Sequence, residues 1–152
     1  PRFLFQDYVY DPENPWEGLL RSSLLESAFK HVFTSPSSAM ASESGSASNR
    51  CTKSSNAHIH GMRYVAVASI TYIATQVRFA LSSTATFSRT DTVTDSEYFY
   101  FLLIDLLDDP EEYEEVTSLI WWWNQQIFPS YISETHAIHK DSVIAKIKER
   151  RR

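Results

Sequence analysis

One stretch decides the fold class: TDSEYFYFLLIDLLDDPEEYEEVTSLIWWWNQQIFP, which runs from Thr94 to Pro129. Thr94 and Glu97 form a capping-box pattern, so a helix is predicted to begin there and to run to about Asp108. The part from Tyr98 to Leu107 contains a single charged residue and is otherwise apolar on every side, which is typical of a helix surrounded by others. We therefore expect this helix to be the central element of a bundle.

The same stretch predicts a second helix directly after the first. Asp109, Pro110 and Glu112 repeat the start signal: a cap residue, a first-position proline and a carboxylate. Because the turn between the two helices is very short, we expect them to pack antiparallel as a hairpin. The predicted apolar seam alternates spacings of three and four residues until Pro129, and it comprises Tyr113, Val116, Ile120, Trp123 and Ile127.

Two more helices are predicted upstream. The first is expected to start with Asn14 as cap and Pro15 as first position and to end before Pro36. The second has Ser69 as its candidate cap, although a β-branched run before it leaves a short strand open. Their apolar stripes are Leu20, Leu24, Leu25, Ala28, Phe29 and Val32 in the first, and Ile70, Ile73, Ala74, Val77 and Leu81 in the second.

The remaining segments complete a single helical domain over residues 1–152. Nine serines in the 21 residues from 35 to 55 predict a flexible, disordered loop, because so few large apolar side chains cannot offset the ordering entropy. Val143, Ile144 and Ile147 suggest a last short helix. The expected fold is therefore mainly α: a compact bundle of four to five helices with a Ser-rich loop. A start at Pro1 without methionine is compatible with a fragment of a longer chain.

Composition excludes several classes of function. The chain has only three glycines, which argues against the Gly-rich phosphate cradles of nucleotide-binding folds. A single cysteine excludes an internal disulfide and favours an intracellular protein of the nucleus or cytoplasm. Apolar runs fall short of the roughly 20 residues that cross a bilayer, so no membrane association is expected. A net charge of −5 weakens a dedicated DNA-binding role.

An acidic segment is the first candidate site. Residues 91–115 hold ten acidic side chains and no basic one. These carboxylates either remain solvated and complement helix dipoles, or form a docking face for a basic partner. Asp105 is the one carboxylate within an apolar helix, and Arg78 is its natural countercharge. The acidic partner-binding candidates are Glu111, Glu112, Glu114 and Glu115.

Three consecutive tryptophans are the second candidate site. Successive residues advance 100° around a helix, so Trp121, Trp122 and Trp123 cannot share one seam. Trp123 belongs to the seam, and Trp122 needs cover from the amino-terminal aromatic segment, from the last helix or from another molecule. Trp121 and Trp122 are therefore either structural or anchors for a partner protein.

Basic residues and histidines give weaker indications. The tail is either a solvated helix end or a nuclear-import or nucleic-acid contact, through Lys146, Lys148, Arg150, Arg151 and Arg152. The pairs His58/His60 and His136/His139 could bind zinc or copper, but the sequence favours ordinary polar histidines because no cysteine or paired Glu-x-x-His motif supports a metal site. No catalytic, cofactor-binding or metal-ligating residue is assigned, and no cofactor is expected.

Several short strings of the chain together resemble a known family. These strings are Ile59–Met62, Ser69–Ile70, Tyr72–Ser83, Phe87–Asp91, Asp95–Glu97, Phe99–Tyr100, Asp109–Glu111, Glu114–Val116, Trp122–Asn124 and Ile127–Pro129. Through them the chain is similar to an uncharacterised domain family of mushroom-forming basidiomycete fungi, which occurs in many closely similar copies. The resemblance implies no activity and no catalytic residue, although the copy number suggests a link to mobile elements.

Three functions remain after this reading of the sequence. The leading hypothesis is a noncatalytic protein-interaction module that uses the acidic face, the tryptophans or both. The second is a nucleic-acid-associated accessory protein of a fungal mobile element, in which the tail contacts phosphates. The third is a hydrolase or metal enzyme with an unrecognised site, which the sequence does not support because it contains no Gly-x-Ser-x-Gly elbow.

Overall fold

The computed structural model describes residues 1–34, 57, 61–83, 85–87 and 95–128. Over these residues the protein is mainly helical, with no β-strand beyond one isolated bridge. The α-helices are α1 (Ser23–Phe29), α4 (Val67–Ala80), α5 (Ser96–Leu107) and α6 (Tyr113–Ile127). The predicted fold class is confirmed. The predicted loop at 35–55 and the predicted last helix around 143–147 lie outside the described residues.

The predicted start of the first helix at Asn14 is wrong. Gly18 and Leu20 have φ angles of +69° and +57°, which a right-handed helix cannot contain. The helix α1 begins instead after Ser22, whose hydroxyl accepts a hydrogen bond from the Leu25 N–H at 3.2 Å. The observed helix is therefore shorter at its amino end than the predicted one, because two left-handed residues and the serine cap precede it.

The chain before α1 folds back on itself. The short 3-10 turns η1 (Arg2–Leu4) and η2 (Gln6–Tyr8) flank Phe5, which bridges to Leu19. This closed segment packs against α1, and its buried apolar side chains are Leu4, Phe5 and Leu20.

Gly18 allows this segment to close. Its carbonyl accepts from the Gln6 N–H at 2.8 Å, and a Cβ added to Gly18 would lie 3.0 Å from the Gln6 Cβ. We expect Gly18→Ala to lower the free energy of unfolding by about 1–2 kcal/mol, because the left-handed backbone conformation is unfavourable for alanine and the added Cβ crowds Gln6. Urea denaturation measures this loss.

Gly61→Ala is the matched control. Gly61 has a similar φ of +67°, but nothing lies within 4 Å of an added Cβ. Its substitution should therefore cost only the backbone term. Equal losses in the two variants would show that the contact with Gln6 contributes nothing.

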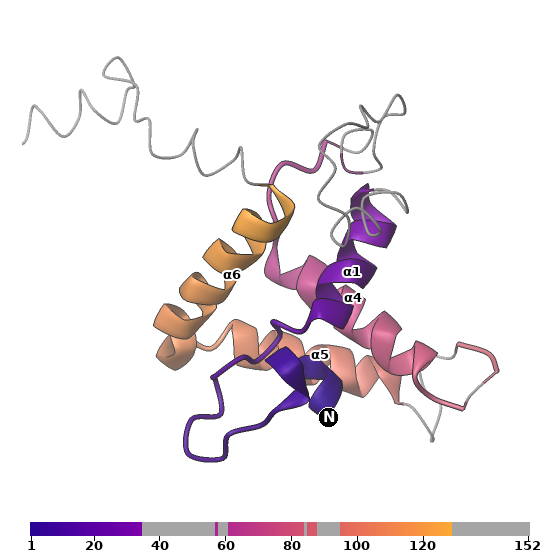
Figure 1. The fold of residues 1–152 in the computed structure, drawn as a ribbon, viewed down its shortest axis with the longest axis horizontal. Coiled ribbons are helices and arrows are strands. Elements are labelled where there is room, and N and C mark those ends of the chain that lie inside the picture. Colours follow the sequence, from indigo (N-terminus) through magenta and orange to yellow (C-terminus); the bar gives the residue numbers. More distant parts are fainter. Residues whose placement is uncertain (35–56, 58–60, 84, 88–94, 129–152) are drawn as a thin grey trace, which may run out of the picture.

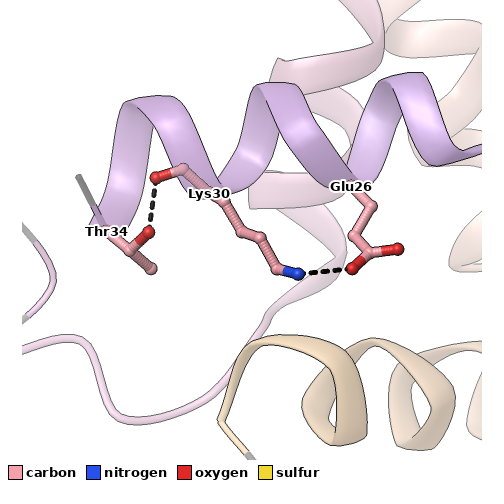
Figure 2. Close-up of polar contacts among 3 residues, drawn as sticks. All are labelled: Glu26, Lys30 and Thr34. Carbon is pink, nitrogen blue, oxygen red and sulfur yellow. Dashed lines mark hydrogen bonds and ion pairs between the residues drawn. The ribbon is translucent and has the colours of Figure 1, made fainter. Parts of the chain in front are cut away.

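A π-helical turn, η3 (Lys30–Thr34), extends α1. Figure 2 shows its polar contacts: the Lys30 ammonium pairs with the Glu26 carboxylate one turn earlier, and the Thr34 hydroxyl donates to the Lys30 carbonyl. Val32 is thus helical as predicted, and the predicted stop at Pro36 lies beyond the described residues.

The helix α4 begins earlier than predicted and excludes the short-strand alternative. Its N-cap is Ala66 and not Ser69; the Ser69 hydroxyl accepts from the Ala66 N–H at 3.1 Å. Leu81 lies beyond the helix end and is exposed. The rest of the predicted stripe is buried, namely Ile70, Ile73, Ala74 and Val77.

The prediction that α5 is surrounded by other helices is wrong. Its N-cap is Asp95, whose carboxylate accepts from the Tyr98 N–H at 3.2 Å, so the observed cap lies one residue after the predicted cap Thr94. Along α5 one face is buried through Ser96, Phe99, Leu103 and Leu107. The opposite face carries Tyr98, Phe101, Leu102 and Asp105, all exposed. The reason is that α4 packs along only one side of α5.

The predicted antiparallel hairpin of α5 and α6 is also wrong. Figure 1 shows α5 running beside α4, while α6 rises away from α5. The 3-10 turn η4 (Pro110–Glu112) separates the two helices, and Asp109 before it has extended backbone angles. A short connection containing proline therefore redirects the chain instead of reversing it.

The helix α6 packs against α1 and the amino-terminal segment. The Trp123 ring lies 5.1 Å from the Phe29 ring, and its indole N–H donates to the Leu20 carbonyl at 3.0 Å. Leu119, which was absent from the predicted seam, is buried, whereas Tyr113 is 70% exposed. Four of the five predicted seam residues nevertheless face inward, because Val116, Ile120 and Ile127 pack against the core beside buried Trp123. The predicted seam is therefore confirmed except at Tyr113.

Candidate interaction surface

Exposed apolar side chains form a stripe on α5. Tyr98, Phe101 and Leu102 are 64%, 53% and 46% exposed, and Asp105 continues the stripe. We call these four residues the α5 outer face. Sequence analysis missed it because an apolar helix suggests burial on all sides; the signal that could have found it is Asp105, which marks the solvent side of that helix.

The predicted acidic candidates do not all face solvent equally. Glu111, Glu114 and Glu115 are exposed around the start of α6. Glu112 is half-buried, and its carboxylate accepts a hydrogen bond from the Trp16 indole N–H at 2.6 Å. Glu112 therefore fixes the amino-terminal segment to α6, and only the other three candidates face solvent.

The three tryptophans have different environments. Trp123 is fully buried, and Trp122 is half-buried against the core, with its ring perpendicular to that of Trp123. Trp121 is 51% exposed. It lies one and two turns after Thr117 and Tyr113, and we call these three exposed residues the α6 outer face. Of the two tryptophans predicted as anchors, Trp121 is the more accessible.

The expected partnership of Asp105 with Arg78 is not what the structure describes. Asp105 is exposed. The Arg78 guanidinium lies over the Phe99 ring, 4.7 Å from its centroid, on the buried side of α5. Arg78 thus covers the core-facing aromatic residue and leaves the α5 outer face acidic.

A buried asparagine is a structural residue that the sequence did not single out. Asn124 is 4% exposed, and its Oδ1 accepts from the Val65 N–H at 2.9 Å. Its Nδ2 donates to the Ile120 carbonyl at 3.0 Å. Asn124 therefore joins the segment before α4 to α6. Its position next to Trp123 in the sequence does not indicate a hydrogen-bond partner 59 residues away.

Two further observations concern enzymatic chemistry. One surface hollow is lined by Gln6, Asp7, Val9, Asp11, Glu17 and Gly18, which supply carboxylates but no histidine, cysteine or hydroxyl. Among the described residues, no group of three or more His, Cys, Asp and Glu is placed to hold a metal ion. The four paired histidines and the basic tail lie outside that part of the chain.

Comparison with known proteins identifies the family. A family model, described as a family of unknown function (DUF6698), matches residues 1–128. The chain belongs to DUF6698. Neither the curated proteins nor the solved structures gave a match.

The DUF6698 match covers every helix described above and ends one residue after α6. Both outer faces therefore lie within the family region. The five basic tail residues from Lys146 to Arg152 lie beyond it. In the described part of this DUF6698 chain, no helix is both long and apolar enough to cross a membrane.

Proposed function

We propose that this chain is a noncatalytic protein-interaction module. The observation that supports the proposal is the set of large apolar side chains left exposed on helices whose inner faces are already packed: Tyr98, Phe101 and Leu102 on α5, and Tyr113 and Trp121 on α6. Exposed apolar patches of this kind mark partner-binding surfaces, and aromatic residues dominate their binding energy.

Charge supports a basic partner. Residues 96–127 contain eight acidic side chains and no lysine or arginine. A surface of this sign attracts basic proteins and repels phosphate backbones. We place the module inside the cell, in the nucleus or the cytoplasm, in keeping with its single cysteine.

An affinity experiment with variants tests this function. The immobilised chain is incubated with an extract of a mushroom-forming fungus, beside a variant carrying Phe101→Ser and Trp121→Ser. We expect one or a few proteins to bind the unmodified chain and to be lost from the variant, because both substitutions remove exposed aromatic anchors.

Thr117→Ala is the matched control, because Thr117 is exposed on α6 but offers no large apolar surface. It should retain the same proteins as the unmodified chain. If the unmodified chain, the double variant and Thr117→Ala all retain the same proteins from the extract, the proposed function is contradicted.

The nucleic-acid accessory role is the alternative proposal, and the basic tail supports it. Nucleic-acid binding that falls steeply with salt, and that disappears when residues 146–152 are deleted, would favour that role.

A further inference from the structure

We propose that the α5 outer face binds a basic amphipathic helix of a partner protein. This inference rests on the proposed function and deepens it, because it names the site and the chemistry of the partner.

The geometry of the stripe suits a helix. Tyr98, Phe101, Leu102 and Asp105 are spaced i, i+3, i+4 and i+7, so they form one line along α5. The twelve residues of α5 extend over about 18 Å, which is about three turns of a partner helix. Large side chains in such a line are the pattern by which one helix packs against another.

The stripe is available for binding because the core does not need it. Phe99, Leu103 and Leu107 are buried on the opposite side of α5, where α4 packs. A partner can therefore cover the α5 outer face without disturbing the fold. For the same reason, substitutions in the stripe should leave the core intact.

Charge determines the chemistry of the partner. Asp105 lies within the stripe, and exposed Asp108 and Asp109 follow at its end. The carboxyl end of α5 adds the negative partial charge of a helix terminus. No lysine or arginine occurs between residues 90 and 139, so the chain on both sides of these groups carries only negative charge. A partner helix with lysine or arginine beside its apolar stripe would place positive charge next to these carboxylates and the helix end.

A second copy of the chain and a nucleic acid fit this face less well. A second copy of the chain would bring the same carboxylates face to face, and like charges in an interface oppose binding. A phosphate backbone would meet the same repulsion.

The α6 outer face is a less suitable site for a helix than the α5 outer face. Thr117 separates Tyr113 from Trp121, so the apolar stripe on α6 is interrupted.

Peptide binding to the full chain tests the inference. The probes are two fluorescent synthetic helices longer than about 15 residues. Both carry leucine at i, i+3, i+4 and i+7; one has lysine at the flanking positions and the other has glutamate. Fluorescence anisotropy should show binding of the lysine peptide, weakening as NaCl rises, and no binding of the glutamate peptide.

Variants locate the binding site. Phe101→Ala with Leu102→Ala should weaken lysine-peptide binding at least tenfold, because exposed anchors in an interface contribute this much. Asp105→Lys should weaken the lysine peptide and strengthen the glutamate peptide. Leu81→Ala is the matched control, because Leu81 is 60% exposed and lies outside both outer faces, and binding should not change. Tyr113→Ala with Trp121→Ala is the α6 variant, which compares the two outer faces. Thermal melts establish that each variant is folded.

Each contrary outcome has a separate meaning. If the α6 variant loses the lysine peptide and the α5 variants keep it, the assignment to α5 is overturned, but an interaction module remains. Equal binding of both peptides, or of neither, also overturns the inference. If Phe101→Ala lowers the mass of the chain alone in sedimentation, the face joins two copies of this chain and the proposed occupant is wrong. The extract experiment reports on the proposed function independently.

Discussion

Replacing Trp123 with alanine should lower the free energy of unfolding by about 3–5 kcal/mol, the usual cost of truncating a fully buried aromatic residue. Trp123 is 0% exposed and packs against Phe29. It also holds Leu20, which has a left-handed φ of +57°, through the hydrogen bond to the Leu20 carbonyl. The substitution therefore leaves a cavity and removes a contact that supports an unfavourable backbone conformation.

Trp121→Ala is a control of the same chemistry, two residues away. Because Trp121 is 51% exposed, we expect its loss to change stability by about 0.5 kcal/mol or less. Urea unfolding of both variants measures the difference. Similar losses in the two variants would contradict the placement of α6 against α1.

The second large effect is expected for Asn124→Leu, at about 2–3 kcal/mol. Leucine is similar in size but cannot accept the Val65 N–H, and Val65 is 1% exposed. A buried backbone donor without an acceptor costs about 1–3 kcal/mol, and the bond to the Ile120 carbonyl is lost as well. Urea unfolding measures the loss, and hydrogen exchange should become faster at the Val65 amide.

Gln125→Leu is the control for Asn124→Leu, since Gln125 is the next residue and is exposed. It should leave both stability and Val65 exchange nearly unchanged. Unchanged exchange at Val65 in Asn124→Leu would show that Asn124 does not hold the chain before α4.

The helices themselves were predictable from the sequence, because local signals specify them. The stripe from Ile70 to Val77 repeats at helical spacing, and Asp109 with Pro110 gives a cap and a first position that the structure retains. These features depend on residues only a few positions apart, so the local sequence is enough to predict them.

The directions of the helices were not predictable from the same signals. Leu20 adopts a left-handed conformation that its side chain disfavours, and the contacts that hold it come from Trp123, 103 residues later. The turn between α5 and α6 is short, yet α6 turns toward α1, where the Trp123 ring packs against the Phe29 ring. Long-range packing decides both features.

The candidate surface was predictable in part. The sequence selected Trp121 and the acidic residues Glu111, Glu114 and Glu115, which are exposed. It did not separate Glu112, because nothing local indicates its hydrogen bond with Trp16. It missed the α5 outer face, because composition alone cannot show that α4 covers only one side of α5.

The most direct test of the proposed binding surface is a nuclear magnetic resonance titration of the ¹⁵N-labelled chain with the lysine peptide. The account predicts that amide signals shift at Tyr98, Phe101, Leu102 and Asp105, while the indole N–H signal of exposed Trp121 stays in place. Shifts centred on Trp121, or no shift along α5 at saturating peptide, would contradict the account.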